Sequence, residues 1–250
     1  MQKNVVITDV TRMRYGNVCI AGYTGYPGKL SCVRPVSSTG HIPEKWLSDE
    51  GNAIIRPFSK VRLNFLEKPD ITPPHTEDHV IDLRSKPSES VLLSTDARLK
   101  LLERLNDGYV KDIFGARIIH HDGWYLKAGR GSRSLGTIEV ADLEDVYYGP
   151  DFMGYRTDYR MAFNDGRASY RLAITDLSFR YYADSLKAQG WSNEMISIYL
   201  KTIISVSSRV FLRIGLARGW QKRPDRCYLQ ITGVYSFPDY LGGRCFTDFR

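Results

Sequence analysis

The sequence predicts a mainly β (α+β) protein made of two small β-barrels joined by a helical bridge. Short β-branched segments separated by glycine-bearing turns recur near both ends of the chain, and a helical segment separates the two groups. The 250 residues suffice for two modules of about 100–120 residues, each with its own core. We therefore expect an N-terminal barrel in residues 1–85, a helical and loop bridge in 86–136, and a C-terminal barrel with an inserted helix in 137–250.

Five short strands are expected in the first module, a number that suits a small barrel. The clearest of them alternates with period two, so that Val61, Leu63 and Phe65 share the inner face. A turn rich in glycine and proline at residues 23–29 indicates a hairpin. The expected strands are residues 4–8, 17–21, 30–33, 58–65 and 79–83.

A helix is expected at the start of the bridge. Ser94 or Thr95 can cap it, leucines at helical spacing give it an apolar face, and Gly108 can end it. The bridge continues through a basic, glycine-rich loop at residues 127–134.

The second module is expected to hold strands at residues 137–140, 170–176, 210–216 and 227–235, with a helix at 193–208 that Ser192 caps. Two β-modules of similar size suggest a diverged duplication. In the last two strands, alternation predicts inner and outer faces. The outer residues are expected to be Arg213, Tyr228, Gln230 and Thr232.

Composition excludes several classes of protein. A hydrophobic content of 42% is too high for wholesale disorder, and no window holds the roughly 20 apolar residues of a membrane span. A charge follows the first residues too early for a secretory signal. Four scattered cysteines without a C-x-x-C pair exclude a tetracysteine zinc ribbon and suggest a reducing compartment. We expect a soluble cytoplasmic protein with no membrane partner.

Basic residues are concentrated toward both ends of the chain. The formal charge is +7 and the isoelectric point is about 9.2, which favour a polyanionic partner. Residues 201–226 hold seven basic residues and one acidic residue, and the chain has 16 tyrosines and four tryptophans on which bases can stack. Many of these rings are equally compatible with a position in a β-core.

No motif in the sequence marks a catalytic, metal or cofactor site. The nucleophile elbow and the glycine-rich nucleotide loops are absent. His75 and His79 lie in a segment expected to be extended, where residues four apart are about 13 Å from each other and cannot share one metal ion. Carboxylates that a metal-dependent nuclease would need are present without a recognisable spacing, at Asp142, Glu144, Asp145 and Asp176. We therefore expect no catalytic residue, no metal and no cofactor.

Two basic segments are the best candidates for contact with an anion. In the 127–134 loop, backbone amides and two arginines could hold phosphate oxygens, although a solvated loop without a ligand is the more common structure for such a segment. In the 210–230 segment, cations on two strands and their connecting loop could follow phosphates while a base stacks on a tyrosine. The alternative there is an ordinary cationic hairpin. The candidate residues are Arg130, Arg133, Arg213, Arg218, Lys222, Arg223, Arg226, Tyr228 and Gln230.

The same C-terminal segment carries a family resemblance. The segments FLRIGLAR (211–218) and CYLQITGVYSFPDYL (227–241) resemble the prokaryotic dual OB-containing domain family, as do residues 19–22, 33–36, 75–78 and 134–136. Members of this family occur among predicted components of conflict and defence systems. The resemblance spans nearly the whole chain and implies two OB-type barrels that bind a ligand across a barrel face.

These observations favour a non-enzymatic protein that recognises nucleic acid or a nucleotide. Single strands are preferred because no expected helix is both basic and shaped for a major groove. The resemblance implies a recognition subunit in a prokaryotic defence or nucleic-acid-processing system. Three alternatives remain open: a metal-dependent nuclease, a protein-interaction module that docks an effector encoded nearby, and a sensor of a small nucleotide.

Overall fold

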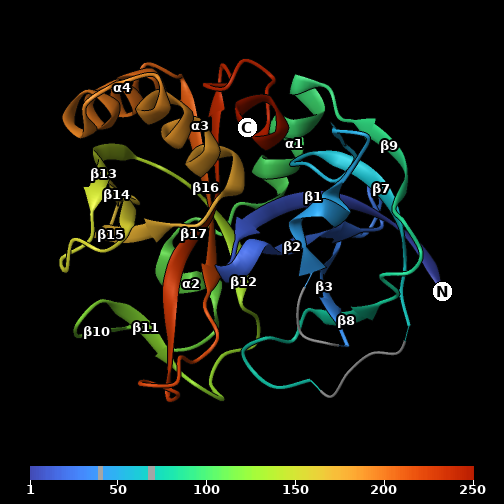
Figure 1. Cartoon of the computed structure of the whole chain (residues 1–250). Coiled ribbons are helices and arrows are strands. Elements are labelled where there is room, and N and C mark those ends of the chain that lie inside the picture. Colours follow the sequence, from blue (N-terminus) through green and yellow to red (C-terminus); the bar gives the residue numbers. More distant parts are fainter. Residues whose placement is uncertain (39–41, 67–70) are drawn as a thin grey trace.

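The computed structural model describes residues 1–38, 42–66 and 71–250, and it shows two curled β-sheets side by side (Figure 1). The N-terminal sheet lies on the right of the view and the C-terminal sheet on the left, with most of the helices gathered at one end of the pair. None of the helices among the described residues has the length and apolar character needed to cross a membrane.

The N-terminal barrel is a closed set of five strands with small additions. The five strands are β1 (Gln2–Arg12), β2 (Asn17–Thr24), β3 (Ser31–Ser37), β7 (Ser59–Asn64) and β8 (Asp78–Ile81). Their order is β8-β3-β2-β1-β7, and a bridge between Phe65 and Ile81 joins the two ends of this order. The additions are β4 (Ile42–Pro43) beside β2, a separate hairpin of β5 (Ser48–Asp49) and β6 (Asn52–Ala53), and β9 (Ser88–Leu92) beside β7. Two short 3-10 helices are η1 (Arg14–Gly16) and η2 (Glu44–Leu47).

The C-terminal barrel repeats this topology. Its strands are β12 (Leu135–Glu139), β13 (Asp142–Pro150), β14 (Thr157–Asn164), β15 (Ser169–Ile174), β16 (Arg209–Leu216) and β17 (Arg226–Phe237). β12 pairs with β16 and β13 pairs with β14, so these two consecutive segments act as one bent first strand. In both barrels the third and fifth strands are parallel neighbours, β3 with β8 and β15 with β17. A five-stranded Greek-key barrel is the architecture of the OB fold, and the predicted fold class is confirmed.

The segment between residues 86 and 136 contributes to both sheets as well as carrying helices. α1 (Thr95–Leu105) begins where expected, because the Ser94 side chain accepts a hydrogen bond from the Ala97 amide. Gly108 follows with a φ of +79°, a conformation that glycine adopts without strain. After α2 (Val110–Ile113), the strands β10 (Ile119–His120) and β11 (Trp124–Lys127) extend the C-terminal sheet beyond β17.

Two helices interrupt the second barrel, where the sequence predicted one. α4 (Asn193–Ser205) matches the prediction, including its Ser192 cap. α3 (Leu177–Ala188) was not predicted; its cap is Asp176, whose carboxylate accepts from the Phe179 amide. The 3-10 helix η3 (Phe246–Phe249) near the C-terminus packs against α3, and Phe246 reaches the core of the N-terminal barrel.

The two barrels share a buried seam. An apolar cluster joins Val6 of β1 and Phe58 before β7 to α1 and to Phe211, Tyr235 and Phe237 of the second barrel. β1 and β17 lie directly against each other across this seam. The part of the outer face of β16 and β17 that lies at this seam, which alternation assigned to solvent, is therefore covered by the other barrel.

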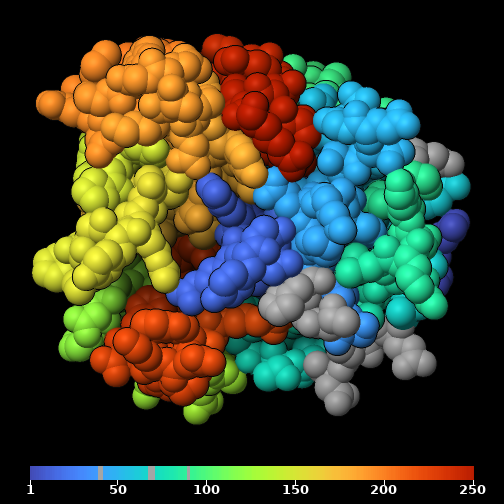
Figure 2. All heavy atoms as spheres, in the orientation of Figure 1, coloured from blue at the N-terminus to red at the C-terminus, as the bar shows by residue number. Residues whose placement is uncertain are grey.

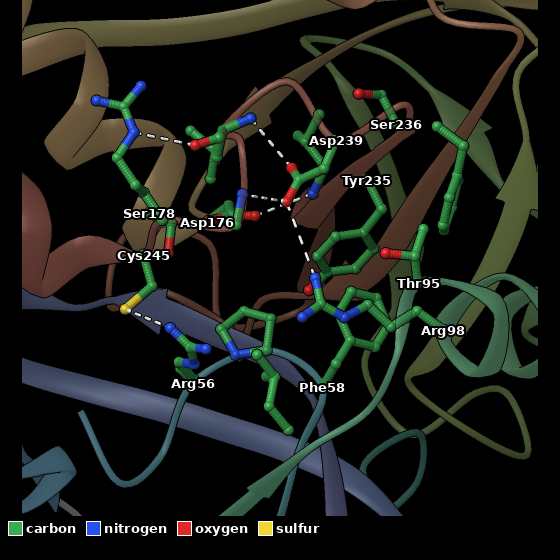
Figure 3. Close-up of a pocket in the computed structure, with 17 residues that line it drawn as sticks. Arg56, Phe58, Thr95, Arg98, Asp176, Ser178, Tyr235, Ser236, Asp239 and Cys245 are labelled. Carbon is green, nitrogen blue, oxygen red and sulfur yellow. Dashed lines mark hydrogen bonds and ion pairs between the residues drawn. The ribbon is translucent and has the colours of Figure 1, made fainter.

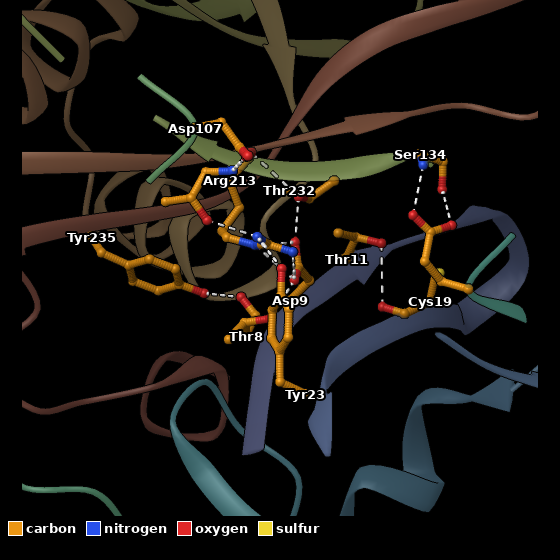
Figure 4. Close-up of polar contacts among 12 residues, drawn as sticks. Thr8, Asp9, Thr11, Cys19, Tyr23, Asp107, Ser134, Arg213, Thr232 and Tyr235 are labelled. Carbon is orange, nitrogen blue, oxygen red and sulfur yellow. Dashed lines mark hydrogen bonds and ion pairs between the residues drawn. The ribbon is translucent and has the colours of Figure 1, made fainter. Parts of the chain in front are cut away.

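This burial corrects two predictions from the sequence. Arg213 is 0% exposed: its Nε lies 3.0 and 3.2 Å from the two carboxylate oxygens of Asp9, and its Nη1 donates to Thr137 at 2.7 Å and to Tyr23 at 3.1 Å (Figure 4). Thr232 is also buried. A register shift between β16 and β17 leaves it without a cross-strand partner, and its hydroxyl donates to Asp9.

Candidate nucleic-acid interface

The two basic segments found in the sequence lie side by side. β11 pairs with the start of β17, so that Lys127 is opposite Arg226, and the Ala128 amide donates to the Asp225 carbonyl at 2.8 Å. The loop after β11 therefore follows the loop that joins β16 to β17, at the lower end of the molecule in Figure 1. We call residues 116–130 and 217–228 together the loop surface.

Five cations on the loop surface are exposed and make no ion pair among the residues that the structure describes. Three of them line one hollow of about 440 Å³ with Ala116 and Ile119. Asp122 and Asp225 are the acidic residues of the surface; Asp122 pairs with His121, and Asp225 lies 4.0 Å from Arg226. The surface therefore carries uncompensated positive charge. The five cations are Arg117, Lys127, Arg130, Lys222 and Arg223.

Aromatic rings lie among these cations. Trp220 is 48% exposed, and the ammonium of Lys222 lies 5.4 Å from its ring centre. Arg226 stacks over Tyr125 at 4.6 Å and donates to the Tyr228 hydroxyl at 3.2 Å. Tyr228 is half-buried, because the turn at Gly123 packs against its ring. Trp220, which the sequence prediction left out, is the more accessible stacking platform.

Other predicted residues are held by partners within the fold. Arg133 donates to the Ile113 carbonyl and forms an ion pair with Asp107. Arg218 forms an ion pair with Asp78, a carboxylate that Arg34 also contacts.

Of the remaining predicted residues, Gln230 lies within β17 between β15 and β16, and is half-buried. The buried Arg213 cannot reach a ligand. The structure thus brings Arg130, Lys222, Arg223, Arg226 and Tyr228 together, and assigns Arg133, Arg213 and Arg218 to internal contacts.

A second cationic region escaped the sequence analysis. A cleft of about 680 Å³ lies between the barrels, and Figure 2 shows it as the hollow bounded by the end of β1 (blue), α3 (orange) and the β13–β14 hairpin (yellow). Asp184 on its wall accepts from Arg12 at 3.0 Å and from the Tyr159 hydroxyl at 2.6 Å. Arg156 and Lys187 line the cleft without an ion pair among the described residues.

An adjoining hollow shares Arg156 and Lys187 with the cleft and is lined by the loop between β13 and β14, where Tyr155 is 81% exposed. In Figure 2 the cleft and the orange-red loop between β16 and β17 lie on the same face of the molecule. No signal in the sequence marks this region, because its residues are spread from Arg12 to Lys187.

The carboxylates considered for a metal-dependent nuclease are dispersed. Asp176 caps α3, and burial raises its pKa to about 6. Asp145 pairs with Arg171, and Glu144 accepts a hydrogen bond from Ser169. Among the described ranges, no three side chains of histidine, cysteine, aspartate or glutamate come close enough to hold a metal ion.

Comparisons with known proteins concern the whole chain. No curated protein matches it. A solved structure described as the crystal structure of the tetrameric p202 HIN2 is similar over 94% of this chain and 90% of that one, with 10% identity and a TM-score of 0.31. Such a low TM-score supports no statement about function.

The family comparison agrees with the topology of the two barrels. The model of the dual OB-containing domain matches residues 3–234, which span both barrels and the segment between them. The chain belongs to the dual OB-containing domain family.

Proposed function

We propose that this protein binds single-stranded nucleic acid on the loop surface, without catalysing a reaction on it. The observation that carries the proposal is the set of five unpaired cations beside the exposed ring of Trp220. Unpaired cations attract phosphates, and an exposed indole can stack on a base of any sequence.

The position of the surface within the barrel supports the proposal. The loop between β16 and β17 joins the fourth and fifth strands of the C-terminal barrel, and the loop that carries Tyr155 joins the first and second. In OB barrels these two connections are the ones that bind oligonucleotides. A strand that contacts both loops would pass the cleft, where Arg156 and Lys187 add two further cations.

A single strand fits this surface better than a duplex does. The cations and rings of the loop surface stand on hairpin ends and loops, and none of those described belongs to a helix that could enter a major groove. Splayed bases can reach both the hollow beside Arg130 and the ring of Trp220. RNA and DNA share this chemistry, so the binding experiment compares strands of both.

The proposed biological role is that of a recognition subunit. The family resemblance supports a place in a prokaryotic defence or nucleic-acid-processing system, in the cytoplasm, where an effector encoded nearby would act on what this protein binds. Co-purification of such an effector without nucleic acid would instead favour the protein-interaction module.

Fluorescence anisotropy with labelled 16-nucleotide RNA and DNA strands tests the binding. We expect the logarithm of the association constant to fall with the logarithm of the KCl concentration, with a slope of about −0.7 for each phosphate contacted and about −3.5 for five. A slope near zero, or binding of a free mononucleotide at the same affinity as the strand, would contradict the proposal.

A matched pair of variants on one loop tests the site. Arg223 is exposed and unpaired, whereas Arg218, five residues earlier, is paired with Asp78. We expect Arg223→Gln to weaken binding several-fold and to reduce the salt slope by about 0.7. Arg218→Gln should have a smaller effect on both. Equal effects would show that the unpaired charges do not define the site.

A further inference from the structure

A narrow pocket lies on the seam between the barrels, remote from the loop surface. The turn before β7, the start of α1, the end of β17 and the C-terminal segment around Cys245 line it (Figure 3). In Figure 1 these elements meet at the upper end of the molecule, whereas the loop surface is at the lower end. The pocket is therefore separate from the proposed nucleic-acid site, and no residue of the loop surface lines it.

Three arginines, Arg56, Arg98 and Arg244, line this pocket with two carboxylates, Asp176 and Asp239. Arg56 makes no ion pair among the described residues; its Nη1 faces only the Cys245 sulfur, at 3.8 Å. Arg98, which is mostly buried, donates to the Leu93 carbonyl and lies 3.8 Å from Asp239, beyond hydrogen-bond distance. Burial and the charge of Arg56 lower the pKa of Arg98 despite the opposing effect of Asp239.

A buried hydroxyl in the same pocket has no partner. Ser178 is 3% exposed, and its Oγ makes no hydrogen bond within the described parts of the chain. Leaving a buried hydroxyl unsatisfied costs about 1–3 kcal/mol, so such groups usually have a partner that the bare protein lacks. The hydroxyl can donate to an anion that enters the pocket.

Two helices begin at this pocket. Thr95 is the first residue of α1 and Ser178 the second of α3, helices of 11 and 12 residues whose amino ends carry partial positive charge. Asp176 also lines the pocket, but its two carboxylate oxygens already accept from the Phe179 and Val234 amides. The hydrogen-bonding groups that remain open are therefore mainly donors.

The size of the pocket limits the ligand. Its cavity of about 50 Å³ holds roughly three to five water-sized groups at about 10–15 Å³ each. A phosphate group has five non-hydrogen atoms. Arginines hold phosphate with paired N–H groups, and hydroxyls and helix amino ends supplement them.

We propose that this seam pocket binds a phosphate group, free or as part of a small phosphomonoester, between Arg56, Arg98 and the Ser178 hydroxyl. The ring of Phe58 and the side chain of Leu92 form an apolar wall beside this position. The wall would contact the organic part of a phosphomonoester. Because the pocket joins elements of both barrels, the bound phosphate would also stabilise the seam.

Titration of the full chain with inorganic phosphate and with adenosine 5′-monophosphate tests the proposal, at constant ionic strength with chloride as the reference anion. We expect one site in isothermal calorimetry and a rise in the unfolding temperature that grows with ligand concentration. Tighter binding of the monophosphate would assign the ligand as a phosphomonoester, and tighter inorganic phosphate would assign the free ion. A dissociation constant of about 1 mM is roughly the weakest affinity of interest. The proposal would be overturned if neither ligand bound at a concentration about tenfold higher.

Three variants locate the site. Arg56→Gln should weaken phosphate binding at least about 10-fold, because it removes a charged donor that makes no ion pair among the described residues. Ser178→Ala should weaken it several-fold, and without phosphate it should not destabilise the protein, because it removes an unsatisfied group. Arg84→Gln, an exposed arginine paired with Asp82 elsewhere on the surface, is the control.

Phosphate affinity equal to wild type in both pocket variants would overturn the proposal. Oligonucleotide affinity measured on the same samples separates this result from the fate of the proposed function. Arg56→Gln should leave oligonucleotide binding intact, and Arg223→Gln should leave phosphate binding intact. A loss of both ligands in Arg56→Gln would mean that the pocket and the loop surface are not separate sites.

Discussion

The buried ion pair between Asp9 and Arg213 provides the sharpest test of how the two barrels are joined. Asp9→Asn keeps the size of the side chain but removes the charge opposite Arg213 and places an amide where one oxygen accepts from the guanidinium. Burial lowers the pKa of Arg213, and Asp9 and Tyr23 more than offset this in the native protein. A guanidinium keeps its proton in proteins even without a counter-ion, so the arginine stays charged in the variant. The substitution therefore leaves a buried charge without its counter-ion.

The magnitude follows from the burial of both groups. Arg213 is 0% exposed and Asp9 is 2% exposed, so water cannot replace the lost partner. Removing one member of such a pair costs about 3–5 kcal/mol. For a chain of this size that loss lowers the unfolding temperature by roughly 6–20 °C. Urea unfolding, followed by tryptophan fluorescence and by circular dichroism, measures the loss in the free energy of unfolding. The control is Asp82→Asn, which breaks an exposed pair with Arg84 and should change stability little.

A double variant separates loss of a counter-ion from loss of packing. Asp9→Leu alone leaves Arg213 charged, whereas Asp9→Leu with Arg213→Met removes both charges from the seam. The double variant should be more stable than Asp9→Leu, because a buried pair is often replaceable by apolar groups while a lone buried charge is not. A double variant less stable than Asp9→Leu, or a cost of Asp9→Asn under about 1 kcal/mol, would show that the buried pair does not hold the barrels together in this way.

Three further predictions concern separate parts of the molecule. Burial and two nearby arginines lower the pKa of His75 from 6.5 to about 3. Only the unfolded chain is then protonated between these values, and stability should fall by about 1.4 kcal/mol per pH unit below 6.5. His75→Leu should flatten this decline in urea titrations from pH 7 to 4, and an unchanged slope would contradict the assignment. Trp220→Ala should cost about 1–3 kcal/mol of oligonucleotide binding in anisotropy; wild-type affinity would exclude stacking there. Gly136→Ala would place a methyl group 2.4 Å from a carbon of Ile113. This overpacking should destabilise the protein by about 1–3 kcal/mol and lower its unfolding temperature. An unchanged unfolding temperature would show that α2 moves to accommodate the methyl group.

The parts of the fold that the sequence predicted depend on neighbours close in the chain. The caps of α1 and α4 are correct because Ser94 and Ser192 bond to amides three residues away. Val61, Leu63 and Phe65 are buried as alternation predicted, because one face of β7 meets its own barrel core. Residues 177–188 were missed as a helix, because their apolar residues pack against two different cores: Leu177 against the N-terminal core and Phe179 against the C-terminal one.

Alternation failed where the second barrel meets the first. The rule that residues on the far side of a strand face solvent holds only for a sheet that water contacts on one side. β16 has Arg213 on that far side, and β1 of the other barrel covers it. Thr232, at the register shift opposite Arg213, faces the same seam, where its hydroxyl donates to Asp9. No pattern among residues close together in the sequence indicates the docking of the barrels or the register shift between β16 and β17.

The candidate interface shows the same dependence on distant residues, through its counter-ions. Arg133, Arg213 and Arg218 were grouped with the other cations because they are neighbours along the chain. Their acidic partners are 26, 204 and 140 residues away, respectively.

What distinguishes Arg130 and Arg223 is therefore the absence of a carboxylate within reach among the described residues, and this becomes visible only when the chain is folded. A cation paired inside the fold gives up its ion pair before it can bind a phosphate, whereas an unpaired one releases only water and small counter-ions. Charge density along the sequence marks the region of the site, and the pairing of each charge in three dimensions selects the residues that can bind.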